Sequence, residues 1–218
     1  MRTVIIVGNT PYTETLQKDE EIWAMNKIFT VQENISRLYI MDDFDCLPKG
    51  TEEILANVSY PIFLKTRNPK IRTSVPYPLL HIARVFGLMG KDDTIYDLEK
   101  SRNFNSTCSL SYLLAQAAYE KVGKIIIHQM MLRRWSLEYM IQKESNDYWI
   151  GFCRGKGIEV VLPDNSFLCK PNSWCSSLYG YVNSENMPAV SGILTNYNRR
   201  LNAISAKFSW SKEFALTL

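Results

Sequence analysis

The sequence predicts an α/β fold: a mostly parallel sheet of about six strands, with helices on both faces and a helical tail at the C-terminus. Two observations lead to this prediction. Short runs of aliphatic and aromatic residues recur along the chain and end in turn-forming polar residues, and helical patterns of apolar residues separate the later runs. Strands that alternate with helices favour a parallel sheet.

The first expected strand lies in "TVIIVGNTPYT", residues 3–13. Val4 to Val7 form a continuous β-branched run, which is typical of a strand buried on both faces. Gly8 ends the run, and a glycine allows a sharp turn or the close approach of a ligand. Because open α/β sheets bind ligands beyond the carboxyl ends of their strands, this glycine marks a candidate site.

Five more strands and three helices are expected after this one. The strands are residues 21–26, 37–43, 60–66, 124–129 and 158–166, and the helices are residues 76–90, 107–123 and 136–157. The pattern weakens after Tyr181, and residues 196–210 are expected to form a terminal helix. We therefore expect one domain over residues 1–181 and a helical extension over residues 182–218, packed on that domain or on a partner subunit of a homo-oligomer.

Composition limits the possible functions. The 218 residues are 46% hydrophobic with a scattered net charge of +3, which indicates a globular protein without a nucleic-acid groove. The densest basic stretch, residues 65–72, is either a solvated loop or an anion-binding lid. The first apolar run is too short for a signal peptide, so a cytoplasmic protein without membrane contact is expected. Five cysteines without a CxxC pair and only two histidines indicate reduced thiols and no metal site.

Short polar side chains follow the ends of several expected strands. They suit a ribose, a base edge or a sugar, although each one alone is explained by the turn preferences of its residue type. Together they favour a ligand site at one edge of the sheet. They are Asn9, Thr10, Asn26, Asp42, Asn165 and Ser166.

The most apolar helix of the chain begins after Asn105, Ser106 and Thr107. A helix start presents unpaired N–H groups and the positive end of the helix dipole, which together bind phosphate. The alternative is an ordinary cap, in which a hydroxyl satisfies the helix itself. Because this helix leads into the strand at 124–129, its start is expected at the same edge as Gly8.

These stretches resemble a family. "VIIVGNTP", "EIWAMNKIF" and "TCSLSYLLAQAAYEKVGKIII" are similar, in this order, to the Rossmann-like nucleotide-binding core of Campylobacter-type bacterial sialyltransferases. They also resemble the related MptE-like hydroxymethylpterin pyrophosphokinases, and the likeness is greatest to phage-encoded members of the group. The resemblance covers residues 3–181. It implies a nucleotide or nucleotide-sugar ligand. It also implies that the protein is phage-encoded and is located in the cytoplasm of the host.

The resemblance also implies roles for individual residues. Gly8 and Asn9 would lie against the phosphates and ribose, Asn26 and Asp42 would border the ribose or base, and Thr107, Cys108 and Ser109 would form the helix start that grips the phosphate. Three positions depart from the sialyltransferase pattern. Ser109 replaces a glycine, Met131 replaces an aspartate, and Phe152 replaces the catalytic histidine.

Three functions remain open. A nucleotide-sugar glycosyltransferase needs a base for the acceptor hydroxyl, and with Phe152 at the histidine position the candidates are Glu138, Asp42 and His128. Each of these also has a purely structural explanation. The second function is a catalytically silent binder of a nucleotide or a nucleotide-derived metabolite, such as a viral protein that sequesters this ligand. Loss of the histidine would produce such a binder.

The third function is a pyrophosphokinase-like transfer from ATP, the only one of the three that requires magnesium. The acids Asp42, Asp43 and Asp45 would hold the metal, and Lys65 or Arg67 would neutralise phosphate. The chain has no P-loop.

The stretch "WIGFCRGKGIEVVLP", residues 149–163, joins the last helix to the last strand. Gly155 and Gly157 flank Lys156, which predicts a helix end and a tight turn before the strand. This turn would lie at the amino end of the strand, so Arg154 and Lys156 are expected to be structural or solvated and not phosphate ligands.

Overall fold

The computed structural model describes residues 1–8, 10–130 and 137–170. The chain divides into two compact units, Met1–Cys169 and Lys170–Leu218. The first unit contains all seven strands of the described chain. The expected boundary at residues 181 and 182 and the expected terminal helix at 196–210 lie outside the described residues, as do Asn9 and Met131.

Seven strands of the described chain form one sheet, and five α-helices and two short 3-10 helices connect them. The strands are β1 (Thr3–Val7), β2 (Glu20–Met25), β3 (Ile35–Ile40), β4 (Ile62–Leu64), β5 (Ser74–Pro76), β6 (Lys124–His128) and β7 (Glu159–Val161). The helices are η1 (Asn26–Thr30), η2 (Phe44–Cys46), α1 (Thr51–Leu55), α2 (Leu79–Val85), α3 (Ile95–Ser101), α4 (Ser109–Tyr119) and α5 (Leu137–Gly155).

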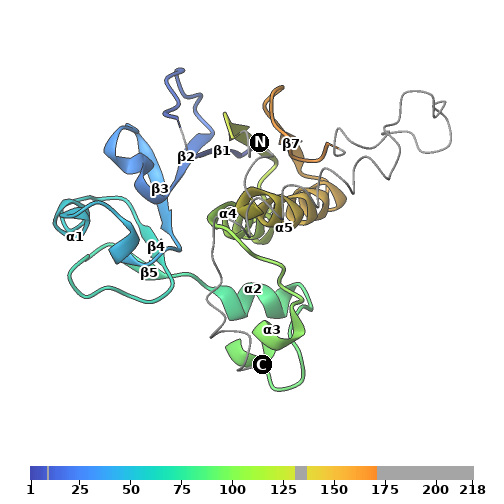
Figure 1. Cartoon of the computed structure of the whole chain (residues 1–218). Coiled ribbons are helices and arrows are strands. Elements are labelled where there is room, and N and C mark those ends of the chain that lie inside the picture. Colours follow the sequence, from blue (N-terminus) through green and yellow to red (C-terminus); the bar gives the residue numbers. More distant parts are fainter. Residues whose placement is uncertain (9, 131–136, 171–218) are drawn as a thin grey trace, which may run out of the picture. The chain divides into compact units, whose positions relative to one another are not determined.

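The sheet order is β5-β4-β3-β2-β1-β6-β7, and every neighbouring pair is parallel. The chain therefore starts in the interior of the sheet, moves outward from β1 to β5, and returns to the other side of β1 as β6 (Figure 1). All carboxyl ends lie at one edge, named here the carboxyl edge; the opposite one is the amino edge. The strand order reverses between β1 and β6, which is where open α/β sheets bind ligands.

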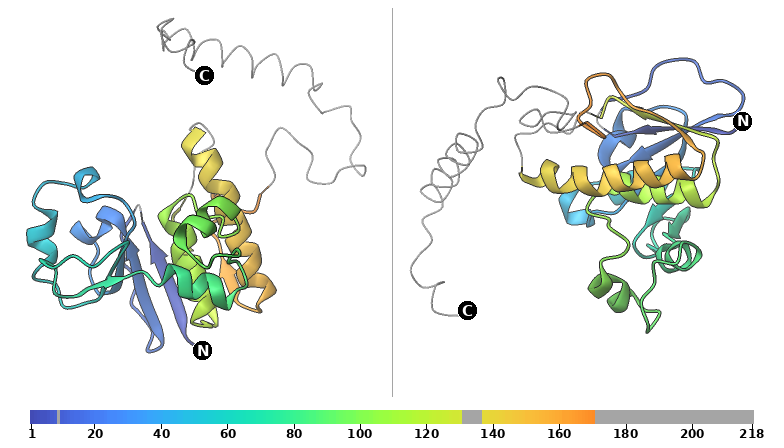
Figure 2. Two further views of the ribbon diagram at one scale, coloured as in Figure 1. Left: turned by 90° about the horizontal axis from the view of Figure 1, so that it is seen from below. Right: turned by 90° about the vertical axis from the view of Figure 1, so that its right-hand side faces the viewer.

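The residues of β1 alternate between the two faces of the sheet. Val4 and Ile6 belong to the hydrophobic cluster that includes α2, α4 and α5, and Ile5 and Val7 belong to the cluster on the face of η1 and α1. Figure 2 shows these two sets of helices on opposite sides of the strands. All four side chains are fully buried, which explains why the sequence run is apolar without interruption. The expected Rossmann-like α/β fold is confirmed.

Helix α4 lies between the sheet and α5, so it is apolar on most of its surface. Leu110, Leu113 and Leu114 are buried together with the alanines that follow them. The helix leads through a short turn into β6 and therefore runs antiparallel to the strands. Its N-terminus consequently lies at the carboxyl edge, as the chain order predicts.

The structure differs from the sequence prediction in its short elements. The sheet has a seventh strand, β5, which is three residues long and ends in Pro76. Proline lacks the N–H that a central strand needs, and β5 lies at the border of the sheet. Helices α1 and α3, of five and seven residues, were also not predicted, because so few residues show no clear helical period.

Candidate functional site at the carboxyl edge

The start of α4 is joined directly to the end of β2. Ser109 Oγ donates a hydrogen bond of 3.0 Å to Asn26 Oδ1. Asn26 has a positive φ of 51°, a conformation that asparagine adopts more readily than most residues. The structure therefore brings together two of the residues that the sequence singled out, although they are 83 positions apart.

The backbone N–H groups at the start of α4 have no acceptor in the described part of the chain. Cys108 is the N-cap residue, and its side chain forms no cap hydrogen bond. Ser109, Leu110 and Ser111, the first three residues of the helix, are buried, and their N–H groups precede the first intrahelical bond. A buried helix start without partners is unusual, and a ligand or water normally satisfies it.

The hydroxyl groups next to this helix start bind other parts of the protein and leave the N–H groups free. Thr107 Oγ1 lies 2.8 Å from Ser145 Oγ on α5, and Ser106 Oγ lies 2.6 Å from Ser111 Oγ. Ser111 Oγ in turn donates to Cys108 O, at 2.6 Å. These contacts argue against the ordinary cap, in which Ser106 or Thr107 would accept from the helix backbone.

A further donor without a partner lies beside the N-cap residue. The Cys108 thiol donates to Asn146 Oδ1 of α5 at 3.2 Å. Asn146 is fully buried, and its Nδ2 has no partner among the described residues. The start of α4 thus combines several N–H donors with no acceptor, an arrangement that suits an oxygen-rich anion.

Gly8 lies against two methionine side chains. A Cβ at this position would clash with Met25 Cε and would come within 3.2 Å of Met130 Cε. Gly8 therefore allows the close approach of side chains from β2 and from the segment after β6. Methionine side chains are flexible, so this packing leaves room for adjustment around the carboxyl end of β1.

The segment after β1 is held over the carboxyl edge by side-chain contacts. Gln32 accepts from the N–H of Tyr12 at 2.7 Å and donates to its carbonyl at 3.3 Å. His128 Nε2 lies 3.2 Å from Pro11 O, and its ring meets that of Tyr12 edge-on. Thr10 Oγ1 donates to Gln129 Oε1 at 3.0 Å.

The three candidate bases do not come together. Glu138, in the first turn of α5, is exposed and accepts from Gln142 at 2.8 Å. The imidazole of His128 is engaged with the segment after β1. Asp42 follows β3, is exposed, and has no hydrogen-bond partner within the described chain.

Asn165 and Ser166 follow β7, the last strand of the sheet. Asn165 is exposed. Ser166 is 1% exposed, and its hydroxyl donates to Met130 O and accepts from the N–H of Leu168. The hydroxyl of Ser166 therefore joins the segments after β6 and β7 and is already satisfied by the protein.

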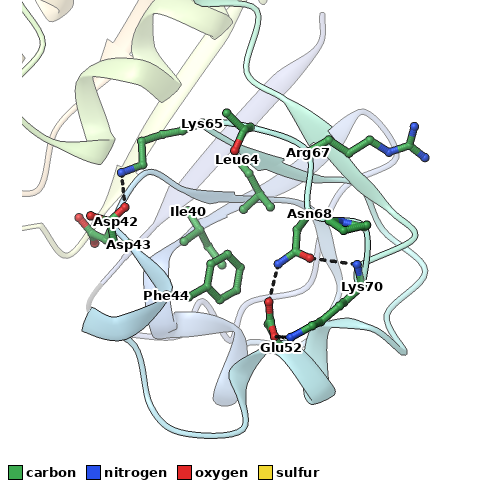
Figure 3. Close-up of a pocket in the computed structure, with 12 residues that line it drawn as sticks. Ile40, Asp42, Asp43, Phe44, Glu52, Leu64, Lys65, Arg67, Asn68 and Lys70 are labelled. Atoms are coloured by element: carbon green, nitrogen blue, oxygen red, sulfur yellow. Dashed lines mark hydrogen bonds and ion pairs between the residues drawn. The ribbon is translucent and has the colours of Figure 1, made fainter.

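A cavity of about 370 Å³ opens at the carboxyl ends of β3 and β4. Ile40, Phe44 and Leu64 contribute apolar surface, and Figure 3 shows the Asn68 amide hydrogen-bonded to Glu52 while the Arg67 guanidinium points away. Asp42 and Asp43 line the cavity with the first part of the basic stretch 65–72. Sequence reasoning did not identify this cavity, because its walls come from three separate segments.

Position 152 lies on α5, beyond the residues that contact the start of α4. Asn146 contacts Cys108 there, and Phe152 is six residues, or about 9 Å at 1.5 Å per residue, further along the helix. Its ring packs against Phe86 and Trp149, with centroid distances of 4.8 and 5.2 Å. That a histidine at position 152 would restore a base stays a prediction, and this histidine would lose the ring contacts of Phe152 with Phe86 and Trp149.

The turn after α5 is as the sequence predicts. Gly157 has a φ of +81°, and the Arg154 guanidinium donates to Val160 O at 3.2 Å. Lys156 lies over the ring of Phe152, 5.4 Å from its centroid. Both basic residues thus stabilise the amino edge.

Neither a metal site nor a membrane-crossing helix is found in the described residues. No group of three or more His, Cys, Asp or Glu side chains there is placed to hold a metal ion, so Asp42, Asp43 and Asp45 form no such cluster. None of the helices described combines the length and the apolar composition that crossing a bilayer requires. Comparison with protein-family models, curated proteins and solved structures finds no match.

Proposed function

We propose that the protein binds a nucleotide or nucleotide-sugar at the carboxyl edge, with a phosphate group at the start of α4. The supporting observation is the buried helix start whose N–H groups lack acceptors within the described chain. Phosphate oxygens accept several hydrogen bonds at once and carry the negative charge that a helix N-terminus attracts.

Two further observations support this location. The strand order reverses between β1 and β6, next to the place where Ser109 contacts Asn26. The polar side chains there are neutral amides and hydroxyls, which orient a ligand by hydrogen bonds and do not transfer protons at neutral pH. Binding is therefore better supported than catalysis.

The glycosyltransferase and pyrophosphokinase reactions have less support. The candidate bases Glu138, Asp42 and His128 lie on separate segments, and two of them already have partners. The described residues contain no cluster of carboxylates suited to magnesium. Release of free nucleotide from a sugar donor would nevertheless establish the transferase, so donor integrity is measured along with binding.

The first experiment is a thermal-shift panel with CMP, UDP, GDP, ADP, ATP and their sugar conjugates. A ligand at one hundred times its dissociation constant should stabilise the folded chain by about 2.7 kcal/mol. A panel in which no compound raises the melting temperature would contradict the proposal.

The location is tested with the substitution Cys108→Asp. Aspartate at the N-cap accepts from the free N–H groups and places a negative charge where the phosphate would bind. The variant should fold and lose at least about tenfold in affinity. Cys108→Asn is the matched control, because it also caps the helix but adds no charge. Equal affinity of Cys108→Asp and the parent would contradict this location.

A further inference from the structure

The cavity at β3 and β4 lies on the same edge as the start of α4. β2 and β3 are neighbours, as are β3 and β4, and neighbouring strands are about 4.8 Å apart. The carboxyl end of β4 is therefore on the order of 10 Å from that of β2, where Asn26 contacts α4. Ile40 and Leu64 belong to the cluster on the face of η1 and α1, whereas α4 covers the opposite face. A mononucleotide that reaches both places would therefore cross the carboxyl edge of the sheet.

The charged groups around the cavity are mostly paired with one another. Lys65 Nζ lies 2.5 Å from Asp43 Oδ1, and Lys70 Nζ lies 2.7 Å from Glu52 Oε2. Two of the cations that line the cavity are therefore neutralised, and the guanidinium of Arg67 points out of it (Figure 3). This arrangement does not suit a phosphate, which argues against the basic stretch acting as an anion-binding lid.

The cavity is lined by a few apolar side chains and by a larger number of polar and charged ones. Ile40 and Leu64 end their strands there, and Phe44 of η2 adds a half-buried aromatic ring. Asp42 lies at the margin and has no partner in the described chain, so its carboxylate is free to accept from an amino or hydroxyl group. A volume of about 370 Å³ lies within the usual range for small-molecule sites.

We propose that this cavity receives the planar heterocyclic base of the nucleotide, with Phe44 and Leu64 against the ring and Asp42 accepting from a ring amino group or from the ribose. This inference rests on the function proposed above. The ligand would extend from the start of α4 over Asn26 and Asp42 to the ends of β3 and β4. An aromatic ring and a few polar groups at the margin are what recognition of a base requires.

The test compares two leucine substitutions. Phe44→Leu removes the aromatic ring from the cavity and keeps an apolar side chain against the core cluster. Tyr60→Leu is the matched control, because Tyr60 packs against the same cluster but does not line the cavity. Affinities are measured by calorimetry on the full chain with three kinds of probe. They are pyrophosphate, the nucleosides cytidine, uridine, guanosine and adenosine, and the nucleotide that binds best in the thermal-shift panel.

Phe44→Leu should weaken nucleotide and nucleoside binding by between about five- and 100-fold, with pyrophosphate affinity unchanged. Tyr60→Leu should leave all three affinities within about twofold. If the parent binds the nucleotide but Phe44→Leu and Asp42→Asn both bind it equally well, the cavity is not the base site and the proposed function stands. If the parent binds none of the three probes, the proposed function itself fails.

Discussion

The two edges of the sheet differ in how their polar groups are paired. At the amino edge, Glu120 accepts from Arg37 at 2.5 Å and from Arg2 at 2.8 Å, and the two guanidinium groups lie over the ring of Trp23. At the carboxyl edge, the start of α4 has N–H donors without acceptors in the described chain. One end of α4 is therefore closed by compensated charges, whereas the other end is left open to a ligand.

The two ends of α4 should therefore have different roles: the end at the amino edge contributes to stability, and the end at the carboxyl edge contributes to ligand binding. Substitutions at the amino edge should change the free energy of unfolding and leave ligand affinity unchanged. Substitutions at the carboxyl edge should change affinity, and some should make the protein more stable, because binding sites often retain unsatisfied groups.

The largest effect is expected at Glu120, whose side chain is 17% exposed. Glu120→Ala leaves the partly buried guanidinium groups of Arg2 and Arg37 with Glu21 as their remaining carboxylate. The free energy of unfolding should fall by about 1.5 to 3 kcal/mol, the range for hydrogen bonds to charged groups, measured by urea denaturation.

The control is Glu159→Ala, which removes an ion pair with Lys124 whose side chains are 30% and 54% exposed. That pair should contribute less than about 1 kcal/mol. If the free energy of unfolding falls by the same amount in both variants, the ion pairs of Glu120 stabilise the protein no more than an ordinary surface pair.

The ion pairs of Glu120 with Arg2 and Arg37 also make the free energy of unfolding depend on pH. Burial alone would raise the pKa of Glu120, but hydrogen bonds from Arg37, Gln116 and Arg2 outweigh it and lower the pKa below its ordinary value of 4.5. A lowered pKa in the folded state means that the stabilisation is complete above the unfolded-state pKa and is lost as the pH falls through the folded-state pKa. The stability difference between the parent and Glu120→Gln should therefore be constant near neutral pH and shrink below about pH 4.5. A difference that grows on acidification would contradict this sign.

A smaller effect of the opposite sign is expected at the carboxyl edge. Cys108→Asp supplies the missing cap of α4, so without ligand it should raise the free energy of unfolding by about 0.5 to 2 kcal/mol. Urea denaturation of the parent, Cys108→Asp and Cys108→Ala measures this gain. If Cys108→Asp is no more stable than Cys108→Ala, the N–H groups at the helix start are already satisfied.

The smallest effect is expected at the turn after α5. Replacing both Arg154 and Lys156 by Gln removes charge from the amino edge, where Arg154 donates to Val160 O. Stability should fall by a few tenths of a kcal/mol per residue, and nucleotide affinity should stay within about twofold. A large, salt-dependent loss of affinity would place the phosphate near this turn and not at the start of α4.

The sequence predicted the long elements of the fold better than the short ones. β1 and α4 are recognisable because burial on nearly all sides requires uninterrupted apolar residues. β5 and α1 are too short to show a period, and their place depends on contacts distant in the chain. The fold class and the position of the start of α4 could therefore be predicted, but the number of strands could not.

The details of the candidate site were less predictable. Asn26 and Ser109 were expected at one edge, yet the hydrogen bond between them depends on the packing of α4 across the sheet. The buried Asn146 and the Met25 side chain over Gly8 have no local sequence signal. Phe152 was assigned by resemblance to a catalytic position, but the direction and length of α5 place it near the amino edge.

The most direct test of the central claim is an amide chemical-shift map of the full chain, titrated with the nucleotide that gives the largest thermal shift. We predict the largest changes at the amides of Ser109, Leu110 and Ser111, because a phosphate would accept hydrogen bonds from these groups. Amides at the amino edge, such as those of Gly123 and Gly157, should hardly change. If saturating ligand shifts the amino-edge amides and leaves those at the start of α4 unchanged, the phosphate does not bind at the start of α4.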